Sequence, residues 1–152
     1  MKILIAVDGS EFSRNAVEKF CEMFGKAEND LIEIVSVFEQ IPVTGEPFGV
    51  SADFVRDMEK SGHEQATKFA DQTAETIRHG IADSSARLTT KILKGAAGRM
   101  IVEEAETWGA DLIVVGSHGR GFWERTLTGS VSDAVIHHAP CSVLVVRMAK
   151  AA

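Results

Sequence analysis

The chain has 152 residues, of which 45% are hydrophobic and 25% charged, with a formal net charge of -6. This length suits one domain with a sizeable core, and the negative charge argues against a nucleic-acid-binding surface, which needs clustered Lys and Arg. No apolar run approaches the roughly 20 residues of a membrane span and no signal sequence opens the chain, so we expect a cytoplasmic protein with no membrane partner and no nucleic-acid partner.

The first predicted strand and helix occupy residues 2–25. KILIAV at 2–7 is a short apolar run rich in β-branched side chains, which predicts a strand buried on both faces. Ser10 suits a helix N-cap, and apolar residues then recur at three- and four-residue spacing until Gly25, which suits the position after a helix end.

A second strand and a long helix follow. LIEIVSVF at 31–38 predicts a largely covered strand, although Glu33 and Ser36 interrupt it, and residues 39–49 hold two prolines and two glycines, which predicts a loop. Ser51 predicts the N-cap of a helix that reaches about Ile81. The inner face of this helix is expected at Phe54, Met58, Phe69, Thr73 and Ile77, and the pair Ser61-Gly62 is a candidate site for a break or bend.

The second half of the chain repeats the alternation of strand and helix. Three further strands are predicted at residues 87–93 (RLTTKIL), 111–116 and 142–147, the last two of which are largely apolar runs. The helices between them have apolar rows at Met100, Ile101, Ala105 and Trp108, ending at Gly109, and at Val131, Ala134 and Val135, in a helix from about Thr128 to His138 that stops before Pro140. This alternation predicts an α/β fold, an open five-stranded parallel sheet with helices on both faces.

A glycine-rich stretch follows the fourth predicted strand. Gly116 and Gly119 bracket Ser117-His118, and nine residues then separate Gly119 from Gly129-Ser130, where a helical pattern resumes. Glycines let backbone amides approach a ligand without a Cβ in the way, and a helix start adds unpaired N–H donors. Together these features predict an anion site, for which phosphate is the usual anion. Neither the Walker A motif nor the dinucleotide fingerprint occurs in the chain.

The spacing G-x2-G-x9-G-[ST] resembles the ATP-binding branch of the universal stress protein family. The resemblance extends from KILIAVDGS through DLIVVGSHGRG to PCSVLVVR. It implies one Rossmann-like nucleotide-binding domain over residues 1–152 with strand order 3-2-1-4-5. In such sheets ligands bind beyond the carboxyl ends of the strands where the order reverses, here between the first and fourth strands.

The resemblance also implies which residues bind the nucleotide. Adenine would be held through Ala6, Val7, Asp8 and Val37, and the triphosphate would lie over Gly116, His118, Gly119 and Arg120 and then meet Gly129, Ser130, Val131 and Ser132. The Asp8 carboxylate can accept hydrogen bonds from ribose or adenine, or it can simply order the turn before Ser10. The glycines can likewise serve only turn geometry. A divalent ion, Mg²⁺ or Mn²⁺, is expected to be held mainly by the phosphates.

Other polar residues suggest weaker hypotheses. His118 can act as a base in phosphoryl chemistry or merely belong to the phosphate cradle, and Arg120 and Arg125 are candidates for stabilising phosphate charge or are surface arginines. His137-His138 point about 100° apart on a helix, which makes them poor joint metal ligands. Cys21 and Cys141 are expected to be small buried hydrophobes, not a disulfide.

We therefore predict a universal stress protein that binds ATP and acts as a switch or carrier, with hydrolysis slow or absent, because no nucleophile–base–acid set is visible. The alternatives are a true ATPase or phosphotransferase using the same pocket, and a nucleotide-independent interaction module. The apolar strand Ser142 to Arg147 would be a sheet edge that invites association, and the family forms dimers through it. A homodimer is expected, unless the terminal MAKAA residues shield this edge.

Overall fold

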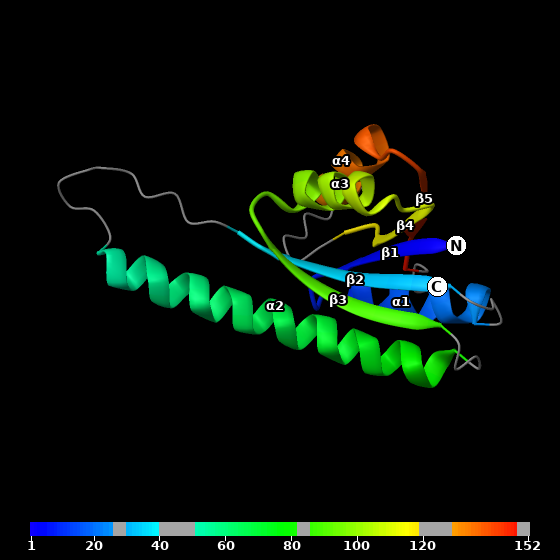
Figure 1. Cartoon of the computed structure of the whole chain (residues 1–152), viewed down its shortest axis with the longest axis horizontal. Coiled ribbons are helices and arrows are strands. Elements are labelled where there is room, and N and C mark those ends of the chain that lie inside the picture. The colour runs from blue at the N-terminus through cyan, green and yellow to red at the C-terminus, as the bar shows by residue number, and fades with distance from the viewer. Residues whose placement is uncertain (26–29, 40–50, 82–85, 119–128, 149–152) are drawn as a thin grey trace.

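The computed structural model describes residues 1–25, 30–39, 51–81, 86–118 and 129–148 (Figure 1). Strands and helices alternate along the described chain. The elements in order are β1 (Lys2–Val7), α1 (Glu11–Phe24), β2 (Leu31–Phe38), α2 (Ala52–Gly80), β3 (Arg87–Lys94), α3 (Ala97–Trp108), β4 (Leu112–Gly116), α4 (Ser130–His138) and β5 (Ser142–Val146).

The strands form one parallel sheet in the order β3-β2-β1-β4-β5. The predicted α/β fold with strand order 3-2-1-4-5 is therefore confirmed. The register pairs Val7 with Ser36 on one side of β1 and Ile5 with Val114 on the other. The order reverses between β1 and β4, so the carboxyl ends of these two strands form the switch point of the sheet.

Helices cover both faces of this sheet, and each face has its own core. Ile3, Ile5 and Val7 of β1 belong to the cluster under α1 and α2, whereas Leu4 and Ala6 belong to the cluster under α3 and α4. All five side chains are buried. A strand between two helical layers needs apolar side chains at every position, which explains the uninterrupted run of β1.

The predicted inner face of α2 is wrong over its first turns. Phe54 and Met58 are 53% and 48% exposed, and Phe69 and Thr73 are only partly buried, while Ile77 is fully buried as expected. The buried row consists of Val55, Ala66, Ala70, Ala74 and Ile77. Mostly small side chains let this helix lie close to the sheet.

The suspected break at Ser61-Gly62 does not occur, because α2 is continuous from Ala52 to Gly80. A Cβ built at position 62 would lie only 3.3 Å from the ring of Phe38 on β2. The glycine at this position therefore allows a close approach of helix and strand, and it costs the helix only about 1 kcal/mol relative to alanine.

Most predicted helix ends are confirmed. Ser10 accepts a hydrogen bond from the Ser13 amide, Ser51 accepts one from the Phe54 amide, and Gly109 ends α3 in the left-handed conformation. Gly25 directly follows α1 as predicted, with a right-handed φ of -61° and its amide donating to the Cys21 carbonyl. Thr128, the predicted start of the last helix, lies outside the described residues, and Arg147 follows the end of β5. None of the helices in the described parts of the chain combines the length and apolar character of a membrane span.

Candidate functional site

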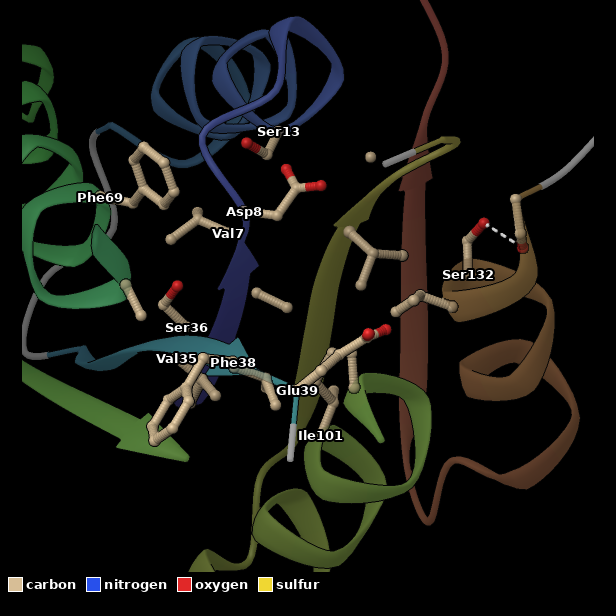
Figure 2. A pocket seen from close by; sticks show the side chains of 18 of the residues that line it. Val7, Asp8, Ser13, Val35, Ser36, Phe38, Glu39, Phe69, Ile101 and Ser132 are labelled. Carbon is tan, nitrogen blue, oxygen red and sulfur yellow. Dashed lines mark hydrogen bonds between the residues drawn. The ribbon is translucent and has the colours of Figure 1, made fainter. Parts of the chain in front are cut away.

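A cavity of about 1000 Å³ opens over the carboxyl ends of β1, β2 and β4 (Figure 2). Its size lies at the upper end of the range for small-molecule sites. All of the predicted site residues that the structure describes border it: Ala6, Val7, Asp8, Val37, Gly116, His118, Gly129, Ser130, Val131 and Ser132. Gly119, Arg120 and Arg125 lie outside the described residues.

Asp8 directly follows β1, in the middle of this cavity. Its Oδ1 atom accepts a hydrogen bond from the Ser10 amide at 3.0 Å, so the turn-ordering interpretation is confirmed. The same carboxylate borders the cavity. Contact between Asp8 and a ligand stays a prediction. The hydrogen bond from the Ser10 amide already holds the carboxylate in place.

The turn after β4 packs tightly against the start of α1. A Cβ built at Gly116 would lie 2.7 Å from the carbonyl oxygen of Phe12, so the glycine is needed for packing as well as for any ligand. His118 is held on two sides, because its Nδ1 lies 3.1 Å from the Ser117 hydroxyl and its ring lies 5.1 Å from that of Phe12. These contacts fix the position of the imidazole at the edge of the cavity.

Hydrogen bonds join this turn to the start of α4. The Ser117 carbonyl accepts from the Gly129 amide at 2.7 Å and from the Ser132 hydroxyl at 2.9 Å. The Ser132 hydroxyl also lies 3.0 Å from the Gly129 carbonyl oxygen. The amide of Gly129 and the hydroxyl proton of Ser132 are thus used to hold the two turns together, which differs from the expectation that both face a phosphate.

The first turn of α4 retains backbone donors. Helix bonding begins with the Asp133 amide, which donates to the Gly129 carbonyl at 2.8 Å, and no side chain caps the helix start. The amides of Ser130, Val131 and Ser132 therefore have no acceptor within the helix. They lie beside the cavity at the positive end of the helix dipole, an arrangement that attracts an anion.

Backbone geometry also directs Val37 toward the switch point. The Phe38 carbonyl accepts from the Gly95 amide on the β3 side of the strand. Successive peptide groups of a strand point to opposite sides, so the Val37 carbonyl points toward β1. Pairing with β1 ends at Val7 and Ser36, one residue earlier. The Val37 backbone therefore faces the cavity beyond the end of β1.

The remaining sequence hypotheses concern metal binding and cysteines. His137 and His138 are exposed on α4, and within the described residues no group of three or more His, Cys, Asp or Glu side chains is arranged to hold a metal ion. Cys21 and Cys141 are free and half-buried. Burial raises the pKa of both thiols, which makes them poor nucleophiles at neutral pH.

Sequence reasoning missed the part of the cavity that lies under α2. Here the lining includes Ser36, Phe38, Gly62, Ala66 and Phe69. These residues belong to no motif and come from two elements far apart in the chain. The only sequence signal was Ser36, a polar residue inside the apolar strand β2.

Comparison with known proteins gives a consistent match over the whole chain. The sequence model of the Universal stress protein family matches residues 1–147. Universal stress protein A homolog 2 of Coxiella burnetii is 38% identical over 148 residues, which cover 97% of this chain and 94% of that protein. Universal stress protein MJ0531 of Methanocaldococcus jannaschii is 33% identical over 149 residues, which cover 98% of this chain and 83% of that protein.

Solved structures show the same fold at lower sequence identity. The structure of the protein MJ0577 superposes with a TM-score of 0.82 at 23% identity and covers 99% of this chain and 97% of that one. A universal stress protein family protein from Arabidopsis thaliana with AMP bound has a TM-score of 0.70 at 20% identity. The match covers 99% of this chain and 93% of that one. A universal stress protein in complex with cAMP has a TM-score of 0.63 at 21% identity, covering 98% of both chains.

Proposed function

The chain belongs to the universal stress protein family, and from this premise we propose that it binds an adenine nucleotide and acts as a nucleotide-dependent switch or carrier in a stress response. The observation that carries the proposal is the cavity at the switch point, which is bordered by Asp8 and by the first residues of α4, whose amides have no acceptor within the helix. Family neighbours that hold AMP or cAMP support an adenine nucleotide as the ligand.

The order of groups across the sheet suggests how a nucleotide would lie. Phosphates suit the amides of Ser130, Val131 and Ser132, because these donors are unpaired within the helix. The Asp8 carboxylate suits ribose hydroxyls, and the Val37 backbone suits a base edge. For ATP, the phosphates would be the main ligands of a Mg²⁺ or Mn²⁺ ion, which would also offset the repulsion from a chain with net charge -6.

The arrangement favours binding with slow or no hydrolysis over rapid turnover. Among the described residues that line the cavity, His118 is the single histidine, and its ring is already engaged by Ser117 and Phe12. A general base has to reach the attacking water in a bound complex. Repeated ATP turnover well above the spontaneous rate would instead support a true ATPase or phosphotransferase.

We further propose that the protein is a homodimer paired through the edge strand β5. The Val146 carbonyl accepts from the Ser117 amide on the β4 side, so the backbone groups of Val143 and Val145 point outward. Val143, Leu144 and Val145 are partly exposed in the single chain. An apolar edge with outward donors and acceptors suits two-fold antiparallel pairing.

The test of nucleotide binding is calorimetric titration of nucleotide-free protein with ATP and with AMP, with and without Mg²⁺. We expect saturable binding in the wild type and none measurable in Gly129→Val. Gly129 has φ of -73° and ψ of 158°, which valine also adopts, so the variant is expected to fold. Its side chain would obstruct the approach of phosphate to the start of α4.

Ile136→Val is the matched control, because it places a valine at an exposed position of the same helix. Wild-type affinity in a folded Gly129→Val protein would refute the phosphate cradle. An absence of binding in folded, nucleotide-free wild type would refute the proposed function and leave a dimeric interaction module as the better account.

A further inference from the structure

Ser36 on β2 carries a buried hydroxyl group for which the described part of the chain offers no hydrogen-bond partner. The residue is 1% exposed, and its Oγ atom has no hydrogen-bond partner among the described residues. A buried hydroxyl without a partner is unfavourable for the free protein, and buried polar groups in native proteins are nearly always paired. A bound ligand is a natural source of the missing partner.

Ser36 lines the arm of the cavity under α2. Figure 2 shows it pointing from β2 toward the space between Val7 and Phe69, and all three residues line the cavity. Opposite the sheet, Gly62 and Ala66 occupy successive turns of α2, and Gly62 packs closely against the ring of Phe38. The rings of Phe38 and Phe69 and the apolar side chain of Val7 give this arm aromatic and aliphatic walls.

Such an arm suits a flat heteroaromatic ring with polar atoms at its edge. Aromatic side chains contact the faces of the ring, and one hydroxyl can donate to a ring nitrogen or accept from an exocyclic amine. A phosphate suits the arm poorly, because apolar walls penalise a charge. The base is therefore the part of a nucleotide that fits here.

The distances across the sheet agree with this placement. Neighbouring strands lie about 4.8 Å apart, so β2 and β4, on either side of β1, are separated by about 10 Å. A nucleotide with its phosphates at the start of α4, beyond β4, and its ribose at Asp8, after β1, would bring its base to the end of β2. Ser36 and Val37 are the residues at that point.

We propose that Ser36 is a specificity-determining residue whose hydroxyl forms a hydrogen bond with the purine base of the bound nucleotide. This inference rests on the proposed adenine-nucleotide function and deepens it. The Val37 backbone and the Ser36 side chain would then contact the same ring from adjacent positions of one strand. Of these two contacts, only the side-chain contact depends on the residue type at its position.

The test compares Ser36→Ala with Ser13→Ala, by calorimetric ATP titration and by thermal unfolding without nucleotide. Ser13 borders the same cavity and is also buried, but its hydroxyl already donates to the Ser10 carbonyl at 3.1 Å. We expect Ser36→Ala to weaken ATP binding by about three- to tenfold, the usual effect of one hydrogen bond. Ser13→Ala should leave the affinity within about twofold of wild type, because it removes no ligand contact.

The two variants should also differ in thermal stability. Removing the unpartnered hydroxyl of Ser36 should raise the melting temperature of the nucleotide-free protein, by up to about 2–4 °C. Removing the paired hydroxyl of Ser13 should lower it. If Ser36→Ala is more stable than wild type without nucleotide but binds ATP less tightly, the hydroxyl of Ser36 forms its hydrogen bond with the ligand and not with the protein.

Three results would overturn the inference while leaving nucleotide binding intact: unchanged ATP affinity in folded Ser36→Ala, an equal loss of affinity in both variants, or a lower melting temperature in nucleotide-free Ser36→Ala. Failure of wild-type protein to bind ATP or AMP would instead overturn the proposed function, and the inference with it. The two failures are therefore distinguished by the wild-type titration.

Discussion

Glu33 is a buried acid at the centre of a small charged cluster on β2, β3 and α3. It is 7% exposed, and its Oε1 atom has no hydrogen-bond partner among the described residues. Burial, and after it the negative charge of Glu104, raise the pKa of Glu33. Glu104 is itself buried and is paired with Lys91, whose Nζ lies 2.8 Å and 2.7 Å from its two carboxylate oxygens.

These shifts predict how stability depends on pH. Because the pKa of Glu33 is higher in the folded protein than in the unfolded chain, folding favours its protonated form. The stability that protonated Glu33 contributes is complete below the pKa of glutamate in the unfolded chain. It is lost as the pH rises through the higher pKa of Glu33 in the folded protein. The pKa of Lys91 is also raised, chiefly by its hydrogen bond to Glu104, so its stabilising effect is lost only at alkaline pH.

We therefore expect Glu33→Gln to increase the free energy of unfolding at neutral pH and to flatten its decline between mildly acidic and neutral pH. Urea unfolding at several pH values measures both effects. Glu106→Gln, at an exposed position of α3, is the control and should leave the profile unchanged. A Glu33→Gln profile parallel to that of wild type would show that Glu33 has an ordinary pKa.

At this same scale, the sequence singled out those cavity-lining residues that belong to a motif. Asp8, Gly116, His118 and the residues of the α4 start border one cavity because each follows the carboxyl end of a strand or begins a helix. Ser36 and Phe69 were not predicted, since they are distant in sequence and meet only through the packing of α2 on the sheet. Glu33 and Ser36 are both polar residues inside a buried strand, and each has a buried oxygen without a hydrogen-bond partner among the described residues.

Among the elements, α2 shows how closely a helix can approach a sheet when its inner row is small. Ala66, Ala70 and Ala74 are all buried, and Ala70 is fully inaccessible to solvent. Interiors packed at crystal-like density have little room for added methyl groups. The small side chains therefore help to set both the height of the helix above β2 and the width of the arm beside Ser36.

Ala70→Leu is expected to destabilise the protein by about 1–3 kcal/mol, because the larger side chain overpacks the interface between α2 and the sheet. Asp71→Leu places the same residue at the next, exposed position of the helix and should change stability by less than about 0.5 kcal/mol. Urea unfolding of both variants gives the comparison. Equal effects at the two positions would mean that α2 does not pack through this face.

The kinds of elements and their order along the chain were predictable from the sequence. Which face of α2 packs against the sheet was predicted only in part. Large apolar residues drew the prediction toward Phe54 and Met58, which lie on the exposed side. The correct row depends on alanines, which carry little hydrophobic signal in a sequence. Hydrophobic periodicity is therefore least informative where close packing requires small residues.

At the scale of the whole molecule, alternation of strands and helices predicted a parallel sheet but not the order of its strands. That order came from the resemblance to a family, because several right-handed crossover arrangements satisfy the same pattern. The order decides which strand ends share the cavity and which strands form the edges. The proposed ligand site and the proposed dimer interface both follow from it.

The proposed dimer can be tested with Val143→Pro. The backbone N–H of Val143 points away from β4, so proline there removes an outward donor without breaking a bond to β4. We expect a folded monomer, measured by size-exclusion chromatography with light scattering. Leu144→Pro is the contrasting variant, because that N–H faces β4 and its loss should destabilise the fold. A folded Val143→Pro dimer, or a monomeric wild type, would contradict pairing through β5.

A single residue, Ser117, connects the proposed dimer edge with the start of α4. Ser117 donates its amide to Val146 of β5, and its carbonyl accepts from Gly129 and Ser132. A ligand that reorients the α4 turn therefore acts on a residue that also supports the edge strand. Equilibrium coupling is reciprocal: if nucleotide strengthens association, association strengthens nucleotide binding by the same factor. The nucleotide affinity would then rise with the concentration of the protein itself, because a higher concentration favours the dimer. The expression level in the cell would therefore affect how much nucleotide is bound.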